Sequence, residues 1–423
     1  MAFAQTVNSL FLRCIMKNHP YFWPIARPRR GSAAALRRQR GAFLITFALF
    51  MLFLLGFMGI ALDFGRLFVV KTELQTAADS CALAAARELD LQPGAVARAT
   101  SAGSAVGGRN SVQFQSGSAN QVHIDFSDTL TGSYSTVFPD NTAKYAECSY
   151  ALTGLKPWLL QIMAAFSSNS AYANNLAVAA RAVATRAPSQ SACIIPVALR
   201  WDSGLPTVGQ WIPFNPGQAK SGNMTWGNLN GTTSASGTEA DMLNGYCVSP
   251  KAGTIFTPGT QANKIAEVWN YRFGIYTDKN MAAVNFALTG SPDYSSFIYT
   301  TSNWTSGHDA YQDFLAKRLA FTPCGVNPGA CGVSTGGYKT VAQKGDLMAH
   351  GADRRVVTLP ITTGSSNYFN NQFACMLMLT PLQPSTMTST FEYLGLATAP
   401  GSPCKGSGLV GGTAGPLVPV LVR

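Results

Sequence analysis

The fold is decided by residues 37–90, which read RRQRGAFLITFALFMLFLLGFMGIALDFGRLFVVKTELQTAADSCALAAARELD. The 21 residues from Ala42 to Leu62 carry no charge, and Thr46 is their only hydroxyl. At ~1.5 Å per residue they form about 31 Å of helix, enough to cross a hydrocarbon core of roughly 30 Å. The stretch therefore predicts a transmembrane anchor over residues 41–62.

Charge is distributed unevenly about this span. Residues 1–40 contain eight basic residues and no acidic ones, whereas residues 41–423 contain the other 23 of the 31 basic residues and all 20 acidic ones. The net charge of +11 therefore falls to +3 beyond the tail. An excess of Lys and Arg beside one end of an apolar span holds that end in the cytoplasm. We interpret residues 1–40 as a largely disordered cytoplasmic tail, and its basicity as a topology signal rather than a nucleic-acid site.

The length of the apolar core favours a retained anchor over a cleaved secretory signal. A signal peptide has an apolar core of about 7–15 residues and a small-residue cleavage site. Here the core has 21 residues, and Asp63 and Phe64 follow it. We therefore expect a single-pass protein whose N-terminus is cytoplasmic and whose C-terminal region is exported.

The helix is expected to continue to about Leu91, because the next proline is Pro93. Residues 63–92 are amphipathic, since apolar side chains recur every three or four residues along one stripe. The stripe consists of Leu67, Val70, Leu74, Ala77, Ala78, Cys81 and Ala85. Its small residues permit close packing either with a partner helix or against the exported domain of the same chain.

This segment resembles the N-terminal part of the TadG-like proteins of the Tad (tight adherence, Flp) pilus-assembly family. The family pattern is an Arg-Gly-Ala start, an apolar span, D-x-G-R and then L-Q-x-A-A-D-x-A-A-L-A-A-A. The matching motif residues, proposed as a helix interface, are Asp63, Gly65, Arg66, Leu74, Gln75, Ala77, Ala78, Asp79 and Leu83. The resemblance covers about 50 residues and departs at Cys81, where the family usually has Ala. It implies a non-enzymatic inner-membrane component with a periplasmic region. Its expected partners are membrane lipid and Tad pilus-assembly proteins or pseudopilins.

The same resemblance raises a second possibility, a minor pseudopilin that is incorporated in the fibre. In pseudopilins a peptidase cuts after a Gly, and a Glu lies five residues further on. Counted from Gly41, the fifth position is Thr46 and the sixth is Phe47. Because the Glu is absent, we expect no cleavage between Gly41 and Ala42.

The exported part is predicted to be α+β, with a Tad-like segment over 93–188 and a β-rich periplasmic domain over 189–423. Short apolar runs between Gly, Ser and Asn loops predict strands. Examples are VHIDF at 122–126, CSYALTG at 148–154 and VWNYRFGIYT at 268–277. Helices are predicted over 156–166 and 308–320.

Eight of the nine cysteines lie beyond the span, where an oxidising compartment permits disulfides. The candidate pairs are Cys324–Cys331, which closes a short turn-rich loop, and, by sequence order alone, Cys193–Cys247 and Cys375–Cys404. The sequence holds no C-x-x-C pair, and its four histidines are isolated. It therefore predicts no zinc site and no other cofactor.

One motif points to a different class of protein, an anchored periplasmic hydrolase. Residues 332–336 read GVSTG and match G-x-S-x-G with Ser334 as nucleophile, and Asp346 and His350 follow. That nucleophile needs a strand before it and a helix after it, whereas a Cys/Pro/Gly loop precedes Ser334. We predict that the chain is not an enzyme, with the Ser334 hydrolase as the alternative.

Overall fold

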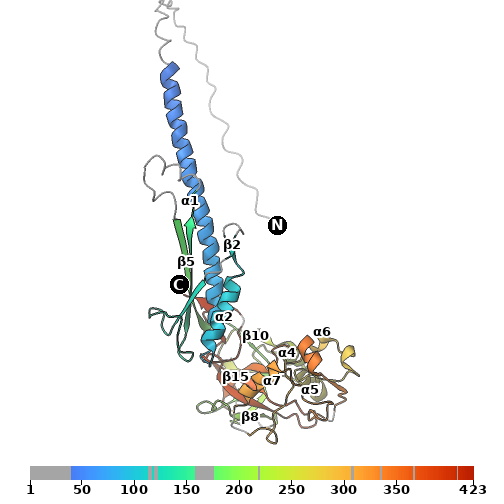
Figure 1. Ribbon diagram of the computed structural model, residues 1–423. Helices are drawn as coiled ribbons and strands as arrows, with labels where there is room; N and C mark the ends of the chain where they lie inside the picture. Colours follow the sequence, from blue (N-terminus) through green and yellow to red (C-terminus); the bar gives the residue numbers. More distant parts are fainter. Residues whose placement is uncertain are drawn as a thin grey trace, which may run out of the picture. The chain divides into compact units, whose positions relative to one another are not determined.

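The computed structural model describes residues 40–112, 117–118, 122–157, 176–217, 220–305, 309–333, 336–364, 367–406 and 408–423. The chain divides into two compact units, Met1–Ala61 and Leu62–Arg423. Helix α1 (Arg40–Glu88) contributes residues to both (Figure 1).

In the first unit, α1 is apolar on all sides. Among the described residues, Phe43–Glu88 is the one helix that is long and apolar enough to cross a membrane, and an 18-residue window within it has a mean hydropathy of 2.6. The large side chains of this part are exposed, for example Phe43 at 73% and Leu55 at 60%. A helix that exposes apolar side chains all round is suited to lipid. The predicted long apolar N-terminal helix is confirmed, and it ends at Glu88 rather than Leu91; its length and composition fit a membrane anchor.

The second unit begins with the amphipathic part of α1 and a four-stranded antiparallel sheet in the order β17-β5-β4-β3. The strands are β3 (Val122–Ser127), β4 (Tyr145–Leu155), β5 (Leu176–Pro188) and β17 (Leu417–Leu421). Helix α2 (Ala95–Gly107) and a ribbon of β1 (Ser111–Val112) and β2 (Gly117–Ser118) lie between α1 and β3 in the chain. Strand β17 therefore returns from the C-terminal part of the chain to complete this sheet.

A nine-stranded mixed sheet forms the larger part of the second unit, in the order β10-β6-β14-β7-β9-β8-β16-β15-β11. Because β14 also pairs with β15, six of these strands form a closed ring, β14-β7-β9-β8-β16-β15. The nine strands are β6 (Ala192–Ile194), β7 (Val197–Arg200), β8 (Trp211–Phe214), β9 (Asn223–Trp226), β10 (Tyr246–Val248), β11 (Gly253–Thr254), β14 (Val356–Thr363), β15 (Tyr368–Met378) and β16 (Ser389–Leu396).

Short helices and a small ribbon accompany this sheet. They are α4 (Ala235–Asn244), α5 (Ala262–Tyr271), η2 (Met281–Ala283), α6 (Phe286–Thr289), α7 (Ala310–Leu319), α8 (Lys344–His350) and the pair β12 (Ile275–Tyr276) with β13 (Thr340–Val341). Helix α5 supplies the aromatic centre of the core. Its Trp269 ring lies 5.1 Å from Phe214, 6.0 Å from Trp226 and 5.5 Å from Phe391 between centroids.

The predicted α+β class with a mostly β C-terminal half is confirmed. Strands β3 and β4 contain the predicted 122–126 and 148–154, and α7 lies within the predicted 308–320. The strand predicted over 268–277 is wrong in its first part, because residues up to Tyr271 belong to α5. Ile265, Ala266 and Trp269 are buried at helical spacing. The predicted strand begins at Val268 and so leaves out the first two of these residues, which show the helical periodicity. The helix predicted over 156–166 falls mostly outside the described residues.

Candidate functional site

The apolar stripe of α1 is covered by its own domain. Its members from Val70 to Ala85 are at most 2% exposed, and the neighbouring Ala82 and Ala86 are fully buried as well. They form one core with inward-facing residues of the four-stranded sheet, among them Ile124, Cys148 and Ala182, and Figure 1 shows α1 running along this sheet. Of the two packing partners that the sequence allows, the structure therefore uses the chain's own domain.

Helix α2 meets α1 through small residues on both helices. Ala95, Ala99, Gly103 and Gly107 recur at every fourth position of α2 and are all buried. A Cβ atom at Gly103 would lie 3.2 Å from the Cys81 Sγ atom. Small side chains shorten the distance at which two helices pack. The small-residue stripe of α1 thus receives a helix, but that helix belongs to the same chain.

Polar residues on the flank of the stripe bind the edge of strand β5. Strand β17 pairs with β5 over residues 184–188, and backbone hydrogen bonds of the residues after β17 extend this pairing to Val183. Before that point, Lys71 Nζ donates to the Ala179 carbonyl, and Gln75 Nε2 donates to the Arg181 carbonyl at 3.0 Å. The four residues from one donor to the next rise ~6.0 Å along the helix, and the two residues from one acceptor to the next rise roughly 6.6 Å along the strand. The spacing of the donors therefore matches the spacing of the acceptors. Helix α1 therefore covers a sheet edge that would otherwise be open to other strands.

The motif residues Gln75 and Asp79 act together at this edge. Gln75 Nε2 also donates to Asp79 Oδ1 at 2.8 Å, one helical turn further on. The Asp79 carboxylate therefore helps to orient the amide that reaches the Arg181 carbonyl. Leu74 and Leu83 lie beside them, Leu74 buried and Leu83 partly buried against the same core.

The D-x-G-R motif lies at the other end of the sheet. Asp63 is only 3% exposed, and Arg66 Nη1 donates to the Lys156 carbonyl, just after β4, at 3.1 Å. Asp63 and Arg66 line a small hollow with Leu155. Asp63 and Arg66 therefore lie against the end of β4. Gly65 differs from its neighbours, because a Cβ atom there would meet nothing within 4 Å.

One face of this half-helix remains exposed, and we name it the Gly65 face. It consists of Phe64, Gly65, Phe68, Thr72 and Thr76. Phe64 is 49% and Phe68 is 69% exposed. The Thr72 and Thr76 hydroxyls donate to the helix carbonyls four residues earlier, at 2.8 and 3.0 Å. Because these hydroxyls are satisfied within the helix, the face is available for an apolar contact.

Four disulfides stabilise the second unit. They are Cys81–Cys148, Cys193–Cys247, Cys324–Cys331 and Cys375–Cys404. No partner for Cys81 or Cys148 is predicted from the sequence; these two are also consecutive cysteines, and their bond joins α1 to β4. The bond at Cys81, the position where the chain departs from the family pattern, links α1 covalently to its sheet.

The residues considered for a hydrolase have other partners. Asp346 accepts the Gln343 backbone N–H at 2.8 Å and caps α8. The His350 ring stacks on Phe286 at 4.2 Å. Ser334 lies outside the described residues. Within the part of the chain that the structure describes, no group of three or more His, Cys, Asp and Glu is placed to hold a metal ion.

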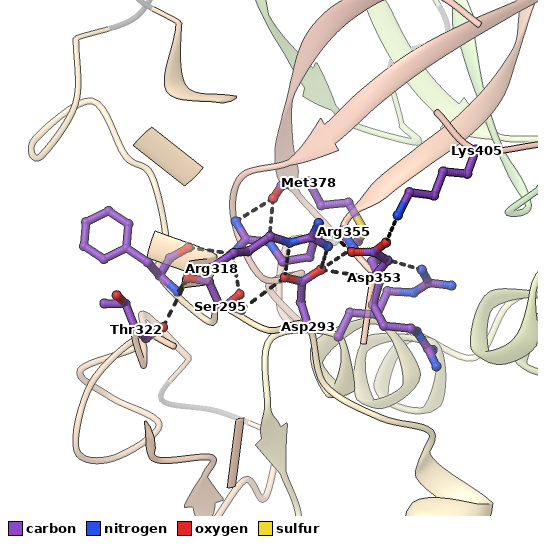
Figure 2. Close-up of polar contacts among 11 residues, drawn as sticks. Asp293, Ser295, Arg318, Thr322, Asp353, Arg355, Met378 and Lys405 are labelled. Carbon is purple, nitrogen blue, oxygen red and sulfur yellow. Dashed lines mark hydrogen bonds and ion pairs between the residues drawn. The ribbon is translucent and has the colours of Figure 1, made fainter. Parts of the chain in front are cut away.

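A buried ion cluster occupies the second unit (Figure 2). Asp293 is fully buried and accepts from Arg318 Nε at 2.9 Å and Nη2 at 2.7 Å. It also accepts the backbone N–H groups of Arg354 and Arg355, each at 2.9 Å. Burial lowers the pKa of Arg318, but the hydrogen bonds and charge of Asp293 outweigh it and raise that pKa.

Arg355 satisfies its guanidinium with backbone oxygens. It is fully buried, and its donors reach the carbonyls of Ser295, Phe297 and Met378 at 2.6–3.1 Å. Burial lowers the pKa of Arg355 to about 10. The local sequence signal for this cluster is weak, an Arg-Arg pair at 354–355 directly before the apolar strand β14.

Comparison with known proteins bears on α1. Residues 41–88 match the Tad family, described as Flp pilus-assembly TadE/G-like. No curated protein and no solved structure matches the chain at a significant level. The match ends at Glu88, which is also the last residue of α1, so it covers the apolar span, the D-x-G-R motif and the buried stripe. In this segment the chain is similar to the TadE/G-like proteins of Flp pilus assembly.

Proposed function

We propose that the chain is a non-enzymatic, membrane-anchored component of Tad/Flp pilus assembly that anchors or scaffolds the machinery from the periplasmic side. The basic tail, residues 1–40, would face the cytoplasm, and residues 63–423 the periplasm. The charge asymmetry about the span supports this orientation. The four disulfides fit an oxidising compartment.

The observation that carries the proposal is the Gly65 face, which lies inside the family-matched segment. This face follows the apolar span directly, within reach of other helices that share the membrane. The absence of a side chain at Gly65 lets a partner backbone approach closely, as small residues do at helix interfaces in membranes. Phe64 and Phe68 supply apolar area, and burying one such side chain fully contributes about 1.5–3 kcal/mol. We therefore assign the contact with pilin-like helices to this face rather than to the buried stripe.

Gly65→Leu tests the proposal, because a Cβ atom at this position meets no atom of the chain within 4 Å. The matched control is Gly345→Leu in α8, where a Cβ atom also meets nothing within 4 Å. Both variants should reach wild-type levels in the membrane. Cells with Gly65→Leu should lose surface pilin, measured by immunoblot of sheared fibres, whereas Gly345→Leu should keep it. Normal piliation with Gly65→Leu would exclude this face as the contact.

A minor pseudopilin is a second candidate, because the family match begins at Gly41, where a pseudopilin would be cut. N-terminal sequencing of the protein from membranes separates the two roles. A mature N-terminus at Ala42 would favour the pseudopilin, and an intact basic tail would favour the anchor. A periplasm-dependent reporter fused after Asp90 should be active, and a silent reporter would reverse the proposed orientation.

A further inference from the structure

A cleft of about 450 Å³ lies in the second unit, next to the ion cluster. It is lined by the end of α4, by residues of β6 and β14, and by charged side chains from distant parts of the sequence. Those charged residues are Arg272, Arg318, Arg354, Lys405 and Asp353. The volume is within the range of about 300–1,000 Å³ typical of small-molecule sites. In the described lining, four cations thus face a single carboxylate.

The carboxylates near the cleft form ion pairs with two of these cations, Arg318 and Lys405. Asp353 pairs with Arg318 Nη1 at 2.6 Å and with Lys405. The buried Asp293, behind the cleft, also pairs with Arg318. Figure 2 shows Asp353 reached by Lys405 beside this cluster. These ion pairs leave the positive charges of Arg272 and Arg354 to be balanced in another way.

Arg272 and Arg354 bind backbone oxygens at the end of α4. Arg272 Nη2 donates to the Met242 carbonyl, and Arg354 Nη2 donates to the Leu243 carbonyl, both at 2.6 Å. The C-terminal end of a helix carries only about half a negative charge. Arg272 Nη1 also donates to the Arg354 carbonyl, at 2.6 Å. Two full positive charges are therefore held by backbone carbonyls, which carry only partial negative charge.

Arg272 also has an unused donor. Its side chain is buried, with the residue 5% exposed, and its Nε atom has no hydrogen-bond partner within the described part of the chain. Burial lowers the pKa of Arg272 well below its ordinary value, and the charge of Arg354 adds to the shift. A buried cation without a full counter-charge is unfavourable, and an anion in the cleft would relieve it.

We propose that this cleft binds a ligand of small-molecule size through an oxyanion, a carboxylate or phosphate group, held by Arg272, Arg354 and Lys405. Guanidinium groups bind both kinds of oxyanion through parallel N–H donors. Asp353, whose side chain is 39% exposed, competes with the ligand for Arg318 and Lys405. The proposal does not depend on the pilus-assembly role.

The test is calorimetric titration of the full chain in non-ionic detergent, with inorganic phosphate and with glutarate in separate runs at constant ionic strength. Lys405→Gln should weaken binding roughly two- to fivefold, as expected for loss of one exposed charge contact. Asp353→Asn should tighten binding by a similar factor, because it removes the competing carboxylate. Two substitutions of opposite sign distinguish a defined site from general loss of structure.

A second ion pair, on α5, provides matched controls. Lys264 pairs with Glu267 at 3.1 Å, and its side chain is 60% exposed against 66% for Lys405. Lys264→Gln and Glu267→Gln should leave binding unchanged. Binding of phosphate alone, of glutarate alone or of both supports the site and names its ligand chemistry. The proposal is overturned if neither probe binds, or if the cleft variants behave like the controls. If Lys405→Gln fails to fold by circular dichroism, Asp353→Asn decides.

Discussion

Gly107→Ala tests whether α2 is held against α1 by the absence of side chains. Gly107 is the last residue of α2 and is buried. A Cβ atom there would overlap the Tyr150 hydroxyl and lie 3.1 Å from the Cys81 Cβ atom. Tyr150 is 3% exposed on the sheet beneath. Its ring cannot move aside without displacing neighbouring core residues.

The expected loss combines two opposing effects. Forcing an extra methyl group into a packed core costs about 1–3 kcal/mol. Alanine is favoured over glycine inside a helix by up to about 1 kcal/mol, and by less at a helix end. The free energy of unfolding should therefore fall by about 1–2 kcal/mol, which lowers the Tm by roughly 1–3 °C for a unit of this size.

The assay is urea unfolding of the full chain in detergent, followed by circular dichroism. Gly65→Ala is the matched control, since it adds the same methyl group to α1 where nothing lies within 4 Å. It should raise stability by roughly 0.5–1 kcal/mol. Tyr150→Phe removes the overlapped hydroxyl, so Gly107→Ala should cost less in that background. Equal losses in both backgrounds, or no loss in either, would refute the proposed contact.

Four further predictions concern the second unit. Gln75→Ala should lower the unfolding free energy by about 0.5–1.5 kcal/mol in urea titrations, while Thr76→Ala, whose hydroxyl bonds within α1, should have a smaller effect. Asp293→Asn should cost about 3–5 kcal/mol, because it leaves the buried Arg318 and Arg355 without their full counter-charge. Burial raises the pKa of Glu392 from 4.5 to about 7, so the unfolded chain releases this proton first as the pH rises. Stability should then fall by about 3 kcal/mol between pH 4.5 and 7, and Glu392→Gln should flatten that fall. Replacing Cys81 and Cys148 together by Ala should cost about 2–4 kcal/mol, read as a lower Tm.

The elements that the sequence predicts are those whose periodicity is local. The apolar run from Ala42 and the apolar stripe after it can each be recognised from a few consecutive helical turns of sequence. Together they correspond to α1. Strand β3 follows from a short apolar run of the same local kind. The prediction at helix α5 is wrong, because the strand predicted over 268–277 starts after the first buried residues of this helix. Without those residues the helical spacing is lost, and the remaining apolar run resembles a strand.

Contacts between distant residues are not predictable in this way. Strand β17 pairs with β5 across more than half of the chain, and neither sequence alone names the other. The cleft gathers Arg272, Arg354 and Lys405 from three separate segments. Each is an ordinary basic residue in its own segment, and only the tertiary fold brings the three together.

The roles of the motif residues follow from what each one touches. Leu74, Ala77 and Ala78 are buried against the sheet, Gln75 and Asp79 serve its edge, and Asp63 and Arg66 lie at its end. Leu74, Ala77 and Ala78 are buried and therefore unavailable to another protein, whereas Arg66, Gln75 and Asp79 are partly exposed and make contacts within the domain. Gly65 is the exception, because the space above it meets no atom of the chain. If one position of the motif serves recognition, the packing assigns that role to Gly65.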